Sequence, residues 1–396
     1  MGNPLRVGMV CPYSLSVPGG VQQQVLGLGR ELRRMGVEVR VLAPCDGPPP
    51  ATFVTPLGNS LPTSANGSIA PLAPDPSAQL RTIRALTDEE FDVLHLHEPF
   101  VPGPTMTALL VHTAPILATF HSAGDSASYR YLRAPIIAAG ERIVHRVAVS
   151  KDARELAHRY IGGEYEILFN GVELDVYRAA SGHPTTRPTI FFCGRHEERK
   201  GLDVLLRAVR DLPGDLSVWV GSTGPDTARL RAAHAGDPRI EWLGRLTDEE
   251  KVARLKGATV FCAPSLHGES FGVVLIEAMA AGTAIVASGL DDYRNVATDD
   301  VDALLVEPGD ADALRGALAR VLGDAALRQR LVTAGAVRAD DFSMHTLAAL
   351  YRAHYERIVV DRERRRDAAA HPPARRDRAR MLWASLRGDV RSRTDR

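Results

Sequence analysis

The chain has 396 residues, carries 48 Lys plus Arg against 48 Asp plus Glu, and is 45% hydrophobic. That length suffices for two domains of ordinary size, and the balanced charge excludes a nucleic-acid-binding protein that is basic throughout. The four cysteines are widely spaced and form no C-x-x-C pair, so we expect small buried thiols in a reducing, cytoplasmic compartment.

Short apolar runs alternate with helical patterns in the first half of the chain. Residues 5–11 have the composition of a strand, a glycine-rich turn follows, and apolar residues recur at helical spacing from Val21 to Leu32. Further strands are predicted at 37–43, 92–97, 114–120 and 143–150. Residues 44–78, rich in Pro and Ala, are predicted to be loops. The repeated strand–helix order indicates a parallel sheet covered on both faces.

A second strand–helix series begins near residue 186, after a segment with linker composition at 178–188. We therefore predict an α/β protein with two doubly wound, Rossmann-like domains, over 1–178 and 188–342, that face a cleft. A helix at 343–360 is a candidate to cross back to the first domain. The tail 361–396, with twelve Arg and six acids, is predicted to be basic and disordered.

A nearly continuous apolar run from Phe271 to Leu290 is twenty residues long, enough to span a bilayer. Its details argue against a membrane span. Gly282 and Thr283 interrupt the run, the residues after them are β-branched, and the carboxylate of Glu277 lies inside it. We predict a buried helix followed by a buried parallel strand.

Polar residues follow the predicted strands of the second domain, where open α/β sheets bind ligands. Arg195 and Lys200 follow one strand and suit a diphosphate, although an exposed loop would also explain them. Glu269 precedes the apolar helix, and Glu277 lies two turns into it. A carboxylate there suits the paired hydroxyls of a ribose or sugar. The alternatives are a structural ion pair for Glu277 and a helix-start acid for Glu269.

These residues resemble a known family. Glu269-x7-Glu277 is similar to the E-x7-E signature of the retaining family 4 glycosyltransferases of the GT-B fold. Gly194-Arg195 and Lys200-Gly201 resemble that family's phosphate-binding residues, and Gly19-Gly20-Val21 resembles its N-terminal Gly-Gly loop. Across residues 5–360 the likeness is closest to the actinobacterial phosphatidyl-myo-inositol mannosyltransferases, as in "GMVCPYSLSVPGGVQQQVL" and "GESFGVVLIEAMAAGTAIVAS".

The resemblance implies roles for individual residues. The catalytic residues would be His121, Arg195, Lys200 and Glu269. The donor site would comprise Gly20, Arg195, Lys200, Leu246, Lys251, Glu269, Ser270, Phe271, Gly272, Val273 and Glu277. The acceptor site would comprise Tyr13, Gly20, His121, Ser122, Arg130 and Arg133. No cofactor or metal is expected, because the cations do the work of a metal, and His95 and His97 are interpreted as structural.

The implied reaction is transfer of mannose from GDP-mannose to a phosphatidyl-myo-inositol-type lipid on the inner face of the cell membrane. One alternative is a family 4 enzyme with another nucleotide sugar or a soluble cyclitol acceptor, and another is a nucleotide-sugar-binding protein without catalysis. The subgroup's lysine for the lipid phosphate is replaced here by Ser126, and Ser16 stands where an acid is usual. Either Arg130 or Arg133 would then replace that lysine, or the acceptor lacks a phosphate at that place. The basic tail, with Trp383 and Leu386, would contact an anionic membrane surface.

Overall fold

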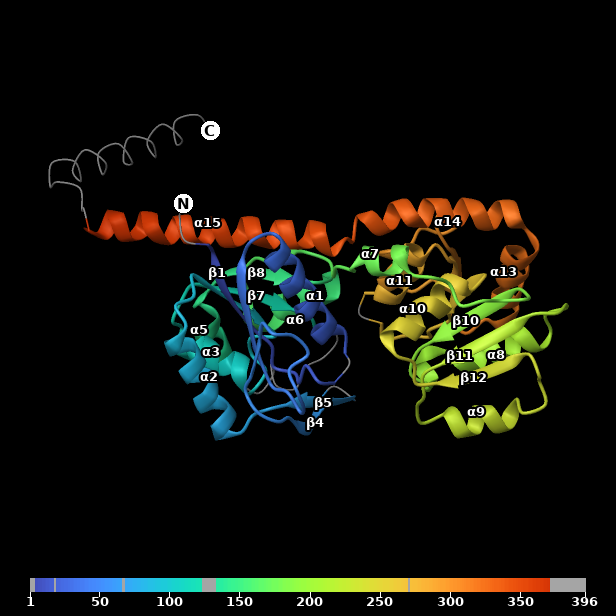
Figure 1. Ribbon diagram of the computed structural model, residues 1–396, viewed down its shortest axis with the longest axis horizontal. Helices are drawn as coiled ribbons and strands as arrows, with labels where there is room; N and C mark the ends of the chain where they lie inside the picture. The colour runs from blue at the N-terminus through green and yellow to red at the C-terminus, as the bar shows by residue number, and fades with distance from the viewer. Residues whose placement is uncertain (1–3, 18, 66–67, 123–132, 270, 371–396) are drawn as a thin grey trace, which may run out of the picture.

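The computed structural model describes residues 4–17, 19–65, 68–122, 133–269 and 271–370. Two α/β units lie side by side, each built on one parallel sheet with helices against it (Figure 1). This arrangement confirms the predicted pair of doubly wound sheets.

The first unit is a seven-stranded sheet in the order β3-β2-β1-β6-β7-β8-β9, with every neighbouring pair parallel. Its strands are β1 (Arg6–Val10), β2 (Glu38–Ala43), β3 (Val54–Pro56), β6 (Val93–His97), β7 (Ile116–Phe120), β8 (Ile143–Ala148) and β9 (Glu166–Ile167). Its helices are α1 (Gly20–Arg34), α2 (Pro76–Asp88), α3 (Pro104–Val111), α5 (Arg133–Gly140) and α6 (Lys151–Ile161). The stretch predicted as loop includes an antiparallel hairpin, β4 (Leu61–Ala65) with β5 (Ser68–Leu72).

The second unit is a six-stranded parallel sheet in the order β12-β11-β10-β13-β14-β15. Its strands are β10 (Thr189–Cys193), β11 (Ser217–Gly221), β12 (Ile240–Gly244), β13 (Val260–Ala263), β14 (Ala284–Ser288) and β15 (Leu304–Val306). Its helices are α8 (Leu202–Arg210), α9 (Thr227–Ala233), α10 (Asp248–Gly257), α11 (Val273–Ala281), α12 (Asp291–Arg294), α13 (Ala311–Gly323) and α14 (Ala325–Asp340), and a 3-10 turn covers Glu198–Lys200.

The long apolar run forms α11 and then β14, as predicted. Gly272 precedes α11 at a φ of +92°, and a Cβ there would lie 2.8 Å from a ring carbon of Tyr293, so only glycine fits. Leu275 and Ile276 are completely buried, so the apolar residues serve a globular core. In the described part of the chain, no helix is both long enough and apolar enough to cross a bilayer.

The chain passes between the two units twice, and the two crossing segments are hydrogen-bonded to each other. The Val172 N–H donates to the Phe342 carbonyl at 2.8 Å, and the Met344 N–H donates to the Val172 carbonyl at 2.9 Å. Gln24 of α1 braces this point, because its amide donates to the Gly171 carbonyl at 2.7 Å and accepts from the Gly171 N–H at 2.9 Å.

The first crossing comes earlier than the predicted linker at 178–188. Helix α7 (Leu174–Ala179) packs on α11, and its Leu174 and Tyr177 belong to the core of the second unit. The boundary set at residue 178 is therefore too late. Composition marks the exposed connection between α7 and β10, but it does not mark the buried face of so short a helix.

Helix α15 (Met344–Ala370) packs along the first unit, and its Tyr351 and Tyr355 are buried in that unit's core. In Figure 1, α14 and α15 follow one another along one side of both units. The predicted return helix is thus present. The prediction of disorder from Asp361 is wrong for residues 361–370, which continue α15, because Arg, Glu and Ala are good helix formers. Residues 371–396 lie outside the described residues.

Candidate functional site

The predicted site residues lie at the carboxyl ends of neighbouring strands. In the first unit Tyr13, Glu98 and His121 follow β1, β6 and β7, which are adjacent in the sheet. In the second unit Lys200 and Glu269 follow β10 and β13, which are also adjacent. This edge is where open parallel sheets bind their ligands.

Lys200 and Glu269 form an ion pair. The Lys200 ammonium lies 2.5 Å from Glu269 Oε1, and the Ser265 hydroxyl donates to the same oxygen at 2.7 Å. The close approach depends on Gly201, since a Cβ there would lie 1.9 Å from the Pro264 carbonyl oxygen. Only 21% of the Lys200 side chain is exposed, so the alternative of an exposed loop is wrong for this residue.

Arg195, the second predicted diphosphate ligand, is much freer. Its side chain is 59% exposed, and its Nε lies 3.5 Å from a carboxylate oxygen of Glu197. Glu197 also forms an ion pair with Arg199 at 2.6 Å, and Arg199 donates to the Gly268 carbonyl at 2.9 Å. Glu197 and Arg199 thus connect the loop after β10 to the loop after β13, and the sequence analysis had assigned neither of them a role.

Glu277 is buried and holds two partners. Its Oε1 accepts from the Lys251 ammonium at 2.7 Å and from the Tyr177 hydroxyl at 2.7 Å. Burial alone would lower the pKa of Lys251, but the carboxylate of Glu277 outweighs it, and the net shift is upward. The alternative of a structural ion pair for Glu277 therefore has a real basis, and its partner is a lysine.

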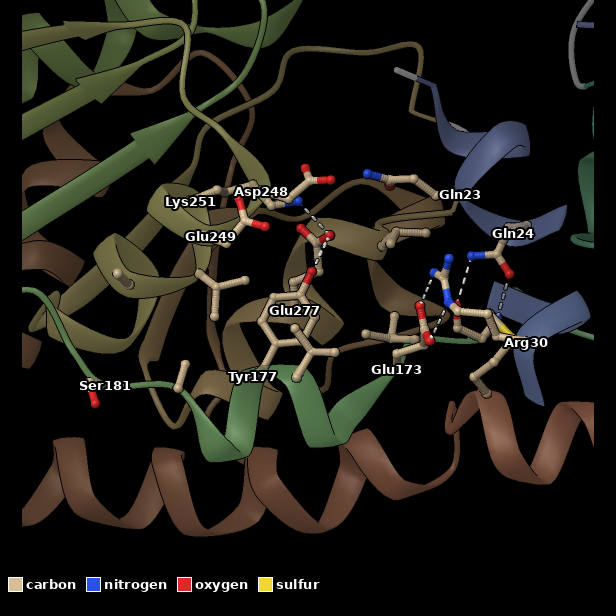
Figure 2. A pocket seen from close by; sticks show the side chains of 18 residues that line it. Gln23, Gln24, Arg30, Glu173, Tyr177, Ser181, Asp248, Glu249, Lys251 and Glu277 are labelled. Atoms are coloured by element: carbon tan, nitrogen blue, oxygen red, sulfur yellow. Dashed lines mark hydrogen bonds and ion pairs between the residues drawn. The ribbon is translucent and has the colours of Figure 1, made fainter. Parts of the chain in front are cut away.

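A cavity of about 460 Å³ adjoins this group. Figure 2 shows Lys251, Glu277 and Tyr177 pointing toward one another on one side, with Arg30 and Gln24 of the first unit across from them. Both units therefore contribute to its wall. Lys251, Val273 and Glu277 are the predicted donor-site residues that line it; Arg195, Lys200 and Glu269 do not.

The remaining residues that were predicted for the donor site differ in how exposed they are to a ligand. The Phe271 side chain is completely buried and stacks on Phe169, with ring centroids 5.1 Å apart, so only its backbone could contact a nucleotide sugar. Leu246 is half-buried and packs against the hydrophobic core of the second unit. Gly20 begins α1 and is exposed. Ser270 lies outside the described residues.

His97, which is buried, and His121, which is partly buried, form an imidazole pair in the first unit. His97 Nδ1 and His121 Nε2 are 3.0 Å apart, and the rings stack with centroids 5.3 Å apart. Burial lowers the pKa of His121 to about 3 and holds the pKa of His97 well below its usual range, so both rings are neutral near pH 7. His97 Nε2 is buried and finds no hydrogen-bond partner among the described residues.

His95 packs against His97 and is itself held by hydrogen bonds. Its ring lies 4.2 Å from that of His97, and its nitrogens bond the Tyr355 hydroxyl and Thr119 Oγ1, each at 2.7 Å. Thr119 also meets the Tyr351 hydroxyl at 2.9 Å. The returning helix α15 therefore anchors the row of histidines that ends at His121, a link that sequence spacing does not reveal.

Glu98 fixes the backbone at His121. One of its carboxylate oxygens accepts from the N–H groups of His121, at 2.6 Å, and Ser122, at 2.5 Å. Tyr13 lies near this carboxylate, and burial first and Glu98 second raise the pKa of its hydroxyl, which stays protonated. Of the other acceptor-site predictions, Arg133 begins α5, and Arg130 lies outside the described residues.

One group of side chains in the described part of the chain could hold a metal ion, namely His145, Glu166 and His354. It lies between β8, β9 and α15. Glu166 Oε2 is 3.1 Å from His145 Nε2 and 3.3 Å from His354 Nε2, and the two rings stack 28° from parallel. Stacked rings direct their lone pairs alongside each other, so they do not converge on a metal, and the Arg357 guanidinium already bonds His354 Nδ1. We interpret the group as a hydrogen-bonded chain.

Two family models cover most of the chain. Residues 18–176 match the model Glycosyltransferase Family 4, and residues 175–338 match Glycosyl transferases group 1. Among solved structures, a glycosyltransferase from Rickettsia africae superposes over 90% of this chain and 99% of its own, with a TM-score of 0.70 and 17% identity. Anabaena Alr3699/HepE in complex with UDP and glucose has a TM-score of 0.67 at 15% identity. The fold and the matched models define a glycosyltransferase of the GT-B fold.

Curated relatives narrow the family. A phosphatidyl-myo-inositol mannosyltransferase of Mycobacterium leprae is 41% identical over 90% of this chain and 98% of its own length. The enzyme of the same name from Mycolicibacterium smegmatis is 38% identical, and a D-inositol 3-phosphate glycosyltransferase from that organism is 30% identical. The chain belongs to the family of the phosphatidyl-myo-inositol mannosyltransferases.

Proposed function

We propose that this protein transfers mannose from GDP-mannose to the inositol ring of a phosphatidyl-myo-inositol-type lipid. The observation that carries the proposal is the 41% identity to an enzyme named for that activity, over 98% of the relative's length. The 30% identity to a D-inositol 3-phosphate glycosyltransferase makes a soluble cyclitol acceptor the second candidate.

On the donor side, transfer leaves a diphosphate that gains negative charge as the bond to the sugar breaks. Lys200 and Arg195 supply two cations at the end of β10, and the free N–H groups at the start of α11 supply further donors. Fixed donors of this kind are worth about 3–4 kcal/mol each in a transition state. No metal or cofactor is required in this scheme.

On the acceptor side, the neutral His121 ring would hydrogen-bond the attacking hydroxyl and the donor sugar. A neutral ring suits this position because an imidazolium would repel the positive charge that develops on the sugar carbon. Glu98 accepts a hydrogen bond from the His121 N–H and so fixes the backbone position from which the imidazole side chain extends. The departing phosphate would take the proton of the acceptor hydroxyl, as the family resemblance implies.

Acceptor lipid would be reached from the inner face of the cell membrane. The tail contributes basic residues to that contact, since residues 361–396 hold twelve Arg against six acids. Each basic residue near an anionic surface adds about 1 kcal/mol of attraction at most. Removing residues 371–396 is expected to weaken sedimentation with phosphatidylserine vesicles and to leave binding to neutral vesicles unchanged.

Three parallel incubations test the proposal. The purified protein receives GDP-mannose with phosphatidylinositol in vesicles, with free myo-inositol, or with buffer alone, and release of GDP and mannosylated product are measured. Product with the lipid alone supports the proposal. Equal or better transfer to free inositol would replace the lipid with a soluble cyclitol, and binding of GDP-mannose without any product would indicate a non-catalytic binding protein.

A further inference from the structure

Tyr177 lies outside the donor-site motifs and yet contacts their central carboxylate. It belongs to α7, the short helix that follows the first crossing between the two units. Its side chain is buried, and its hydroxyl donates to Glu277 Oε1 at 2.7 Å across a separation of 100 residues. Burial first and Glu277 second raise the pKa of Tyr177, so the hydroxyl keeps its proton and remains a donor.

The two bonds to Glu277 converge on one of its oxygens. Lys251 and Tyr177 both bond Oε1, and all three residues line the same cavity. This arrangement leaves Oε2 available as an acceptor for a ligand. A carboxylate held by one lysine could still rotate about that contact, whereas two donors from different directions fix the plane of the group.

We propose that Tyr177 is a positioning residue of the donor site, whose hydroxyl orients the Glu277 carboxylate to receive the ribose hydroxyls of the nucleotide sugar. The inference rests on the proposed function and deepens it. Core packing alone does not require the Tyr177 hydroxyl, because the ring of a phenylalanine would fill the same space in the hydrophobic core of the second unit. The hydroxyl is therefore explained by its hydrogen bond to Glu277.

The position of α7 is fixed from the other unit as well. Glu173, at the start of α7, accepts from Arg30 Nε of α1 at 3.0 Å, and a second contact joins the same two side chains. Helix α7 is thus tied to the first unit at its beginning and to the donor carboxylate four residues later. The orientation of Glu277 consequently depends on a contact made at the junction of the two units.

Nucleotide affinity with and without the ribose hydroxyls tests the role of Tyr177. Binding of GDP and of 2′,3′-dideoxy-GDP is measured by calorimetry on wild type and on Tyr177→Phe, with steady-state kinetics for GDP-mannose. We expect Tyr177→Phe to raise the Kd for GDP and the KM for GDP-mannose by roughly three- to tenfold, the range for the net loss of one ordinary hydrogen bond, because Lys251 still holds the Glu277 carboxylate. The kcat should change less than about twofold, and the Kd for dideoxy-GDP should not change.

Tyr355→Phe is the matched control, because it removes a buried hydroxyl that bonds His95 at 2.7 Å in the other unit. It should leave the Kd for GDP unchanged. Two results would overturn the inference while leaving the proposed function intact: an unchanged Kd for GDP in Tyr177→Phe, or an equal loss for GDP and dideoxy-GDP, which would indicate a purely structural role. Failure of the wild type to bind GDP would instead overturn the proposed donor.

Discussion

The two sheet edges that face each other across this molecule are built from different chemistry. The second unit presents charged pairs, with Lys200 2.5 Å from Glu269 and Lys251 2.7 Å from Glu277. The first unit presents neutral imidazoles, since burial lowers the pKa of His121 to about 3. In the first unit the carboxylate of Glu98 accepts hydrogen bonds from two backbone N–H groups.

This difference matches the two ligands that the proposed reaction requires. A nucleotide diphosphate is an anion, so it must find cations, and in this structure the carboxylate of Glu269 balances the charge of Lys200. An inositol hydroxyl is neutral, so it needs a hydrogen-bonding group that does not change its charge near pH 7.

His121→Ala should have the largest effect and should abolish transfer while leaving GDP affinity close to normal. His121 belongs to the first unit, and the proposed nucleotide ligands belong to the second. Transfer is measured by product formation, and GDP binding by calorimetry. His158→Ala, which removes an exposed histidine of α6, should leave both unchanged. A fall in GDP affinity along with activity would show that the two edges are not separate in function.

Lys200→Ala and Arg195→Ala should each reduce turnover by at least about a hundredfold, the usual scale for losing one group that stabilises charge in the transition state. The structure adds a distinction between them. Arg195 is exposed, so its removal should not alter stability, whereas Lys200→Ala leaves the Glu269 carboxylate beside the neutral hydroxyls of Ser265 and Tyr293 without its cation. Near-normal turnover in either folded variant would remove that residue from the diphosphate site, and Lys256→Ala serves as a control.

Glu277→Gln should raise the KM for GDP-mannose by roughly tenfold and lower the unfolding free energy. The amide keeps an acceptor for Tyr177 but removes the charge that neutralises Lys251, whose side chain is only 19% exposed. Leaving a buried charge unpaired costs about 3 kcal/mol. Urea denaturation at pH 7.5 measures the loss. Unchanged stability would mean that Lys251 finds water or another partner without Glu277.

The sequence was sufficient for most helices and strands and for which polar residues follow which strands, because hydrophobic periodicity and strand-end position are local properties. Thus α11, β14 and the placement of Glu277 and His121 were all predictable. The partners were not. Tyr177 lies 100 residues from Glu277, and Tyr355 lies 260 residues from His95, so only the folded chain brings them together. Composition also failed at residues 361–370, where helix propensity outweighs the basic character.

The buried histidines should make the first unit sensitive to acid. Burial lowers the pKa of His97 and His121, so their unfolded forms take up protons below about pH 6.5 while the folded forms stay neutral. Stability is therefore fully present above that pH and falls as the pH drops, by up to about 1.4 kcal/mol per pH unit for each histidine. Calorimetry at pH 7.5 and 5.5 should show the first unit losing more than the second. His121→Asn should reduce the loss, and an unchanged pH dependence would contradict this role.

A smaller effect of opposite sign is expected where the two edges approach each other. Asp152 lies in the first turn of α6 in the first unit, and Asp292 belongs to α12 in the second. Burial first and Asp152 second raise the pKa of Asp292 to about 7.

Folded Asp292 therefore holds a proton that the unfolded chain releases near pH 4, so its contribution to stability falls as the pH rises toward 7. At pH 7.5 Asp292 has lost its proton for most of the time, and Asp152 then repels it, although solvent screens the pair. Asp152→Asn should then stabilise the protein by about 0.5 kcal/mol at pH 7.5 and by nothing measurable at pH 5, while Glu155→Gln on the same helix changes neither value. Equal stabilisation at both pH values would mean that the Asp152 substitution acts through α6 alone and not across the junction of the two units.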